Sequence, residues 1–410
     1  MHRGKRKIIN DPIYGFITID HPIVFKVLEH PNYQRLRRIS QMALAHLVYP
    51  GAMHTRLSHS LGAYHLMRQA LKELCDKGVK ITEEEKIAAQ VAILLHDIGH
   101  GPFSHSLENL LVKNVSHEDI SSLIMEQMNE EMNGEISLAI KIFKNNYHKK
   151  FLHQLVSGQL DVDRMDYLSR DSFYTGVSEG VIGYDRILKM MTVHQDELMV
   201  EEKGIHSIEK FIVARRLMYW QVYLHKTVLS AEKLLIHILS RAKELFLKGE
   251  EVFATPTLAF FMKQEIDRNT FIQTPTYLEK FCQLDDYDIL SSIKAWMHHP
   301  DKILSTLSRW LINRKLLHLT LQNQPVNDQY FKKLQNRVAE KGQLSPAETH
   351  YFVFHGTATN KTYDIHNEEI NILFKNGTVK DISEVENALI NTTVMIPVKK
   401  FYICHPKDFD

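Results

Sequence analysis

The stretch TEEEKIAAQVAILLHDIGHG, residues 82–101, decides which fold this chain is predicted to adopt. Thr82 and Glu85 have the spacing of a capping box, in which each side chain bonds the backbone N–H of the other residue at the start of a helix. Apolar residues then recur at the helical period until the chain reaches His96 and Asp97. The stretch therefore predicts a buried helix that carries an adjacent histidine and aspartate at its C-terminal end.

Helical periodicity extends in both directions from this helix, from Pro22 to about Lys248. Short loops that contain glycine and proline interrupt it at 49–52 and 99–102. The sequence has no internal repeats, which excludes solenoids and propellers. It predicts a mainly α protein whose helical core spans residues 1–250.

The remaining part, residues 251–410, alternates helix-like stretches with polar loops. Near its end, residues 370–374 and 378–382 have the composition of strands. They flank Asn376 and Gly377, a dipeptide that favours a two-residue hairpin turn. We therefore expect a smaller C-terminal lobe of helices and α+β structure.

Composition limits the classes of function. Lys and Arg number 50 and Asp and Glu number 49, and this balance argues against coating nucleic acid or an anionic membrane by charge alone. Any phosphate binding must therefore come from a local group of positively charged side chains. The chain has three cysteines, no secretory leader pattern and no apolar run long enough to span a membrane. We expect a cytoplasmic protein.

Four residues on separate segments form a candidate ligand set: His59, His96, Asp97 and Asp163. Among 24 histidines, chance pairs of His and Asp are common, so the pair alone indicates little. The apolar helix before it and the two further ligands favour a metal site within residues 50–171. Two imidazoles and two carboxylates suit one divalent ion (iron, manganese, zinc or magnesium) and leave positions for water and a phosphate oxygen.

Longer motifs accompany this set in a fixed order. They are YQRLRRISQ (33–41), PGAMHTRLSHS (50–60), LHDIGHGPFSH (95–105), HE (117–118), DVDRMDYLSRD (161–171) and YLHK (223–226). From Phe16 to about Leu247 the chain resembles the HD-superfamily deoxynucleoside triphosphate triphosphohydrolases, most closely the catalytic core of their SAM-and-HD-domain type. No SAM domain is expected here. The resemblance implies an HD-domain fold and hydrolysis of dNTPs to deoxynucleoside and tripolyphosphate, with additional Mg²⁺ bound to the triphosphate.

The candidate catalytic residues are Arg56, His100, His105, His117 and Glu118. Arg56 lies three positions before the ligand at 59, so a helix would place both on one face, where a guanidinium could hold a phosphate oxygen. The alternative is a surface salt bridge. Imidazoles titrate near neutral pH and suit proton transfer. The resemblance implies that His105 and His117 serve as a general acid and its oriented partner, while His100 is equally consistent with a hydrogen-bonding loop residue.

Two stripes of polar residues have helical spacing. Asp163, Tyr167 and Asp171 stand at i, i+4 and i+8, and a solvated face of mixed charge is the alternative. By resemblance, Arg164 lies near the phosphates, and Tyr167 and Asp171 approach the sugar.

The second stripe is Arg215, Tyr219, Tyr223 and Lys226, spaced for one helical face. Cations at the ends and aromatic rings between them suit a nucleoside triphosphate. An amphipathic packing helix explains the same pattern, and both interpretations can hold together.

The remaining substrate residues follow from the resemblance. It implies that Gln41 and Asp171 bond the 3′-hydroxyl, while Met42 and Tyr223 crowd the 2′-position. Deoxyribose would thereby be selected.

The resemblance also implies an effector site for dGTP or GTP at Lys7, Glu29, Gln34 and Arg37, and a homo-tetramer. A basic tail and a solvated helix face that includes Arg35 and Arg38 are the alternative explanation.

Two other functions remain open for the whole chain. It could be another HD phosphohydrolase, such as a 5′-nucleotidase or a cyclic-nucleotide or guanosine-tetraphosphate hydrolase, or a nucleotide- or nucleic-acid-binding protein with a vestigial metal site.

Overall fold

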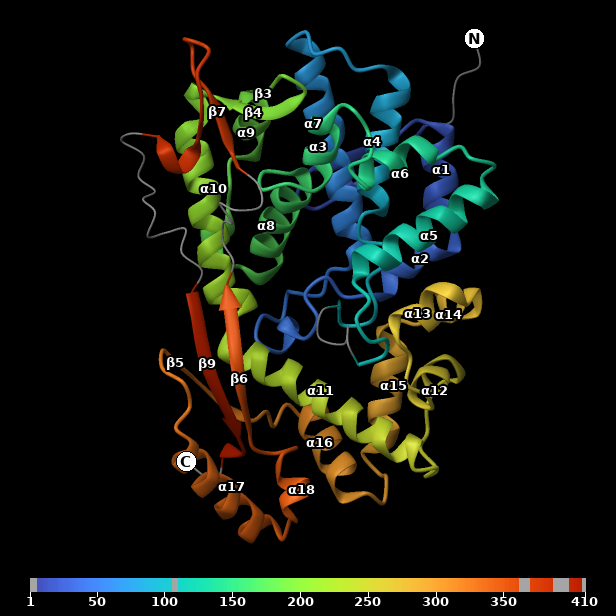
Figure 1. Cartoon of the computed structure of the whole chain (residues 1–410), viewed down its shortest axis with the longest axis vertical. Helices are drawn as coiled ribbons and strands as arrows, with labels where there is room; N and C mark the ends of the chain where they lie inside the picture. The colour runs from blue at the N-terminus through green and yellow to red at the C-terminus, as the bar shows by residue number, and fades with distance from the viewer. Residues whose placement is uncertain (1–5, 105–109, 361–368, 386–397, 408–410) are drawn as a thin grey trace.

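The computed structural model describes residues 6–104, 110–360, 369–385 and 398–407. Helices dominate these residues, and a smaller α+β region follows in the C-terminal part, so the predicted fold class is confirmed (Figure 1). The longest helices are α3 (Arg56–Asp76) and α11 (Lys226–Leu247). In Figure 1, α3 lies in the upper part of the molecule and α11 crosses the lower part.

Three helices form the centre of the upper part: α3, α4 (Glu83–Leu95) and α8 (Val162–Thr175), with α3 packed against both of the others. The capping box of Thr82 and Glu85 is present at the start of α4, as predicted. A Cβ atom on Gly62 of α3 would lie 1.9 Å from Oδ1 of Asp166 on α8. Glycine is therefore required here, because it lets the two helices approach closely enough to share a polar site.

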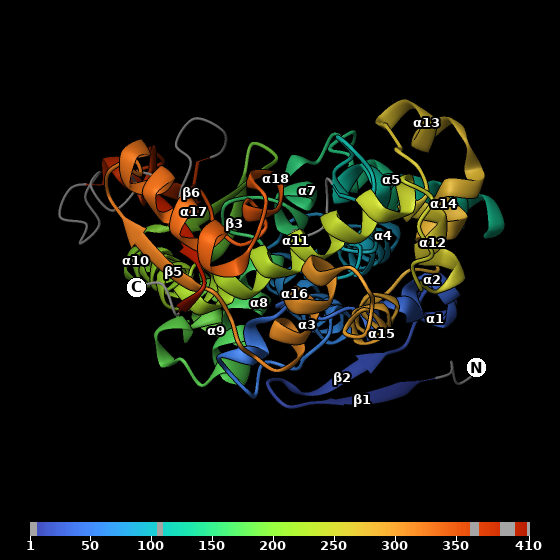
Figure 2. The same cartoon turned by 90° about the horizontal axis from the view of Figure 1, so that it is seen from below.

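The other elements of the first half surround this centre. The strands β1 and β2 form an antiparallel hairpin at the edge of the molecule (Figure 2). The elements are β1 (Lys7–Asp11), β2 (Gly15–Ile19), α1 (Pro22–Glu29), α2 (Pro31–Gln34), α5 (His117–Glu131), α6 (Ser137–Phe143), α7 (Lys150–Val156), α9 (Tyr184–Met190), β3 (Met191–His194), β4 (Glu197–Glu201) and α10 (Ile205–Met218).

The second half packs on α11, which contacts α12, α16 and β5. A three-stranded antiparallel sheet in the order β5-β9-β6 gives this half its α+β character. Its elements are α12 (Pro256–Met262), α13 (Arg268–Gln273), α14 (Pro275–Phe281), α15 (Asp286–Trp296), α16 (Lys302–Ile312), β5 (His318–Gln322), α17 (Asp328–Gly342), α18 (Pro346–Thr349), β6 (Phe354–Asn360) and β9 (Val398–His405).

The predicted C-terminal hairpin exists as β7 (Asn371–Leu373) and β8 (Val379–Asp381), but two details differ from the expectation. Its turn has three residues between the paired Phe374 and Thr378, and Gly377 in this turn has φ +85°. The turn is longer than expected because the Asn376 side chain accepts a hydrogen bond from the Thr378 N–H. The hairpin also joins the first half of the chain, since β7 pairs in parallel with β4 in the sheet β3-β4-β7-β8 (Figure 1).

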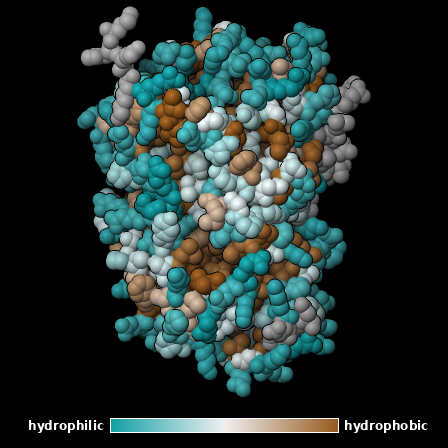
Figure 3. Space-filling model, turned by 180° about the vertical axis from the view of Figure 1, so that it is seen from behind, coloured by the Kyte–Doolittle hydropathy of each residue, from teal (hydrophilic) through white to brown (hydrophobic). Residues whose placement is uncertain are grey.

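One buried apolar cluster contains residues from both halves, from Ile17 to Cys404. The domain boundary near residue 250 therefore stays a prediction. In the described part of the chain, no helix is both long and apolar enough to cross a membrane. The face shown in Figure 3 is largely hydrophilic, with hydrophobic side chains gathered near its middle.

Candidate metal centre and substrate cavity

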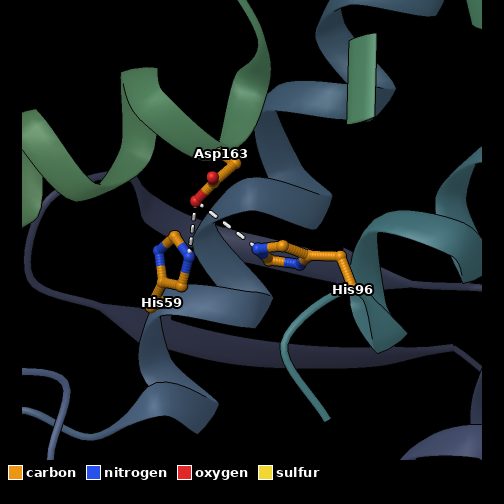
Figure 4. A group of neighbouring side chains, drawn as sticks. All are labelled: His59, His96 and Asp163. Carbon is orange, nitrogen blue, oxygen red and sulfur yellow. Dashed lines mark ion pairs between the residues drawn. The ribbon is translucent and has the colours of Figure 1, made fainter. Parts of the chain in front are cut away.

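Three predicted ligands converge from three different helices (Figure 4). His59 belongs to the first turn of α3, His96 caps the C-terminal end of α4, and Asp163 lies in the first turn of α8. Oδ1 of Asp163 lies 3.0 Å from Nε2 of His59 and 3.4 Å from Nε2 of His96. The ligand atoms of all three residues lie within 4.8 Å of one another, close enough to share one ion.

In both histidines, the Nδ1 atom is held by a contact with another residue of the fold. Nδ1 of His59 lies 2.8 Å from Asp166 Oδ2, and Nδ1 of His96 lies 2.7 Å from the carbonyl oxygen of Ile93. Acceptors at Nδ1 favour the tautomer in which Nε2 carries a lone pair. Both Nε2 atoms are buried and make no well-formed hydrogen bond within the described residues. Two such nitrogens facing a carboxylate fit a divalent metal ion.

The fourth predicted ligand, Asp97, lies beside these three. Its Oδ1 is 3.4 Å from His96 Nε2, and its Oδ2 is 3.7 Å from His59 Nε2. Arg56 donates a hydrogen bond to the same carboxylate. Asp97 also groups with His100 and His117, whose nitrogens lie within 4.8 Å of its oxygen. The structure therefore places Asp97 between the three-ligand group and the candidate proton-transfer residues.

The charges at the centre shift the pKa values of its members. Burial lowers the pKa of His59, but the carboxylates of Asp163 and Asp166 outweigh that effect and raise it to about 10. Burial also lowers the pKa of His96, and Asp97 and Asp163 raise it overall. Burial raises the pKa of Asp97, but His96 and Arg56 hold it well below its usual range. The raised pKa values of the two histidines reflect the carboxylates around them, and a bound cation would neutralise this negative charge.

The turn that carries His96 and Asp97 is held from two sides. Ser121 Oγ on α5 donates to the carbonyl of His96 and accepts the N–H of Gly99 at 2.8 and 2.9 Å. A Cβ on Gly99 would lie 2.2 Å from the carbonyl oxygen of His117, so only glycine fits there. On the other side, the buried Arg35 guanidinium donates to the carbonyls of Ile98 and His100. The solvated helix face, which was the alternative explanation for this segment, is therefore wrong for Arg35.

A cavity of about 610 Å³ opens from the metal centre. It contains every predicted substrate residue except Lys226, together with three candidate catalytic residues and two of the metal ligands. The predicted residues that line it are Gln41, Met42, Arg56, Asp97, His100, His117, Asp163, Arg164, Tyr167, Asp171, Arg215, Tyr219 and Tyr223.

The second predicted stripe, which begins at Arg215, is interrupted before its last residue, Lys226. The helix α10 ends at Met218, a π-helical turn follows over Tyr219–Tyr223, and α11 begins only at Lys226 after the extended residue His225. This break turns the Lys226 side chain to the exterior, where it is exposed. The expectation that Lys226 shares one helical face with Arg215 is therefore wrong.

Three buried polar atoms of the predicted substrate residues have no hydrogen-bond partner in the described chain. They are Nε of Arg164, Nε of Arg215 and Oε1 of Gln41. The two guanidinium groups are otherwise held by Asp161 and Gln159. Donors and acceptors left open inside a cavity are free to bind a ligand.

At the cavity wall, the Asp171 carboxylate has two side-chain partners. Oδ1 lies 2.7 Å from Nε2 of His54, and Oδ2 accepts a hydrogen bond of 2.7 Å from the Tyr223 hydroxyl. His54 is buried and stacks on Tyr174 at 4.4 Å. This arrangement fixes the predicted sugar-binding carboxylate relative to the π-helical turn.

A second, more polar cavity of about 460 Å³ meets the centre from another direction. Glu118 lines this cavity and not the first one, whereas Asp97, His117 and Asp163 line both. The rings of His100 and His117 stack at 4.0 Å. Of the predicted catalytic residues, His105 lies outside the described residues.

The predicted effector residues lie apart from both cavities. Lys7 is exposed on β1, and Glu29 is exposed at the end of α1. Gln34 and Arg37 do meet, because Arg37 Nε donates to Gln34 Oε1 at 2.7 Å, and Gln34 itself donates to the carbonyl of Leu28. Their role in nucleotide binding stays a prediction.

Sequence reasoning missed residues that support the site from behind. Asp166, which bonds His59, is itself held by Arg170, and Arg170 reaches Asp11 on β1 at 2.9 Å. Both side chains on α8 are fully buried. The helical spacing of Asp166 and Arg170 with the apolar Val162 was the available signal, since it places both charges on a buried face.

The chain is similar to known proteins over almost its whole length. The HD domain model matches residues 56–171, and the model of the HD associated region matches residues 182–258. The protein YwfO of Bacillus subtilis is 32% identical, covering 99% of this chain and 93% of that protein. A crystallised phosphohydrolase from Bacteroides thetaiotaomicron is 51% identical, with a TM-score of 0.94 over 98% of this chain and 100% of that chain.

A more distant relative has a described reaction. The deoxynucleoside triphosphate triphosphohydrolase SAMHD1 of Bos taurus is 29% identical over 265 residues, which cover 54% of this chain and 45% of that enzyme. The likeness thus spans less than half of that relative. Taken with the converging histidines and carboxylates, these similarities show that the chain belongs to the HD-domain family of metal-dependent phosphohydrolases.

Proposed function

We propose that this enzyme hydrolyses deoxynucleoside triphosphates to the deoxynucleoside and tripolyphosphate. One observation carries the proposal: a single cavity joins Asp97 and Asp163 to the guanidinium groups of Arg56, Arg164 and Arg215. A triphosphate has a charge near −4 and needs several cations besides a metal ion. The similarity to SAMHD1 supports the same substrate class.

The metal centre supplies one part of the chemistry. A divalent ion held by His59, His96, Asp97 and Asp163 would act as a Lewis acid toward a phosphoryl oxygen. The open Nε donors of Arg164 and Arg215 would bind the phosphates, with Arg56 beside Asp97.

The bond changes of the reaction are simple. The oxygen of a water molecule bonds to the α-phosphorus, and the bond from that phosphorus to O5′ breaks. The water loses its protons to solvent or base, and O5′ takes up one proton to become the 5′-hydroxyl. Among the histidines in the described residues, His117 lines both cavities. We therefore propose that His117 delivers this proton.

The sugar would lie at Gln41, Met42, Asp171 and Tyr223, all of which line the cavity. The open Oε1 of Gln41 and the fixed Asp171 carboxylate suit the 3′-hydroxyl. Met42 and Tyr223 would leave little room for a 2′-hydroxyl. Chromatography of reactions with dATP and ATP tests this selection, because equal rates on the two nucleotides would contradict it.

We further propose that a nucleotide bound at Lys7, Glu29, Gln34 and Arg37 favours a homo-oligomer, a tetramer by the resemblance. Large apolar side chains remain exposed on the single chain, including Phe16 at 68%. An effector promotes assembly only if it binds the assembled state more tightly. Sedimentation and turnover at increasing dGTP should rise together, and indifference of both to dGTP and GTP would contradict the proposal.

A further inference from the structure

One face of α11 forms a long wall of the substrate cavity. The lining residues on this helix are Val228, Leu229, Glu232, Lys233 and Ile236, whose spacing places them on a single side. The helix starts three residues after Tyr223, which bonds Asp171 at the proposed sugar position. Each residue advances a helix by about 1.5 Å, so this wall continues by about 12 Å along the axis from its first to its last lining residue. A base attached to that sugar would lie along it.

Most of this wall is apolar, and Glu232 is the exception that the fold does not explain. Its neighbours along the wall include Val228, Leu229 and Ile236. Within the described chain, no hydrogen bond or ion pair satisfies its carboxylate, whereas Glu244 on the same helix pairs with Arg241 and Tyr351.

Burial raises the pKa of Glu232 to about 7, and Lys233 opposes this rise only in part. An unpaired carboxyl among apolar side chains costs stability. The half-buried carboxyl faces the cavity without a partner in the described chain, so it points to a ligand.

We propose that Glu232 contacts the base of the substrate and selects guanine. This inference rests on the proposed function. Guanine presents two adjacent donors, N1–H and the N2 amino group, which a carboxylate can accept together. Adenine, cytosine and thymine each present a single donor group on that edge. Lys233 lines the same wall and provides a donor for the guanine O6, while its ammonium lies 5.7 Å from the Tyr402 ring centroid.

The test compares wild type with Glu232→Gln and Glu232→Ala. The matched control is Glu244→Gln, which removes a charge from the same helix outside the cavity. Steady-state hydrolysis is measured with the four dNTPs and with dITP, whose base lacks the N2 amino group. Equilibrium binding of deoxyguanosine and deoxyadenosine is measured by calorimetry in parallel, because these nucleosides cannot turn over. Thermal melting shows whether each variant is folded.

We expect wild type to prefer dGTP, with dITP intermediate. Each Glu232 variant should lose about 10-fold or more in kcat/KM for dGTP while dATP changes little, since a two-hydrogen-bond contact to a base commonly gives that discrimination. Deoxyguanosine binding should weaken in step, and the control should behave as wild type. Equal use of all dNTPs, or a dGTP preference that survives in both variants, overturns the inference and leaves the proposed function standing. Selective deoxyguanosine binding that depends on Glu232, without dNTP turnover, supports the base contact and overturns the proposed function.

Discussion

At the metal centre, each histidine uses one ring nitrogen for the fold and presents the other to the ligand group. His59 is held by Asp166 and His96 by a backbone carbonyl. The residues that converge could be predicted from sequence, because their motifs are specific. The supporting Asp166 and Arg170 were missed although their spacing with Val162 was a signal, because an Asp–Arg pair at i, i+4 on a helix is usually exposed. Only the packing of α8 against α3 buries it.

Asp163→Ala should remove the metal. The variant loses the carboxylate that faces both Nε2 atoms, so metal content measured by elemental analysis should fall well below one ion per chain. Because a catalytic metal contributes several kcal/mol of transition-state stabilisation, turnover should fall by about 1,000-fold. Asp185→Ala, an exposed aspartate on α9, is the control. Full metal occupancy in Asp163→Ala would remove this residue from the ligand set.

Arg215→Ala and Lys226→Ala should differ sharply. Arg215 is buried at the cavity with an open donor, and its loss should lower kcat/KM by about 100-fold, as for other groups that stabilise charge in a transition state. Lys226 is exposed beyond the helix break, so its loss should change the rate less than about three-fold. Similar losses in both variants would show that the stripe acts as one unit despite the break.

At the scale of elements, the turn after α4 depends on contacts with segments far away in sequence. Phe103 and Ser104 both have φ +52°, a left-handed conformation that costs about 1–3 kcal/mol each and must be held in place. Asp286 at the start of α15 accepts the N–H of Phe103 at 2.9 Å and that of Ser40 at 2.8 Å. Ser104 in turn accepts two hydrogen bonds from Arg56. No local pattern in residues 99–104 predicts an anchor at 286.

Asp286→Ala should therefore affect both stability and activity. The buried N–H of Phe103 and the half-buried N–H of Ser40 lose their acceptor, and the free energy of unfolding, measured by urea denaturation, should fall by about 1–3 kcal/mol. Turnover should fall as well, because Ser104 positions Arg56. Asp286→Asn retains one carbonyl acceptor and should be intermediate. A variant with normal stability but full activity loss would contradict this anchoring role.

The start of α4 should give stability a dependence on acidic pH. Burial raises the pKa of Glu85, but hydrogen bonds from Lys149 and Tyr147 outweigh burial and set it at about 2. A carboxyl whose pKa is depressed on folding contributes stability above its unfolded pKa of about 4.3, and that contribution is lost as the pH falls toward 2. The contribution amounts to about 3 kcal/mol at most.

Glu85→Gln should remove this dependence. Its difference in free energy of unfolding from wild type should shrink between about pH 5 and pH 2, as followed by urea denaturation at each pH. Glu83→Gln changes an exposed carboxylate in the same turn and should keep the wild-type slope. A constant difference between wild type and Glu85→Gln across this range would contradict the assignment.

The two halves of the chain share the apolar cluster and the polar supports of the site. Arg35 links the turn at Ile98 to the carbonyl of Leu284, and β7 completes a sheet begun by β3 and β4. Sequence periodicity predicted the helices and the hairpin, because those depend on local spacing. It could not place the hairpin, the π-helical turn or the helix break before Lys226, because long-range pairing and packing determine them.

We propose that the metal centre and its arginine-lined cavity release the whole triphosphate from a dNTP. Phosphorus NMR of a reaction with dGTP and Mn²⁺ or Mg²⁺ tests it most directly, with the metal removed before spectra are recorded. We expect tripolyphosphate as the phosphorus product and deoxyguanosine as the nucleoside product, and neither of them with Asp163→Ala. Pyrophosphate with dGMP, or orthophosphate with dGDP, would contradict it.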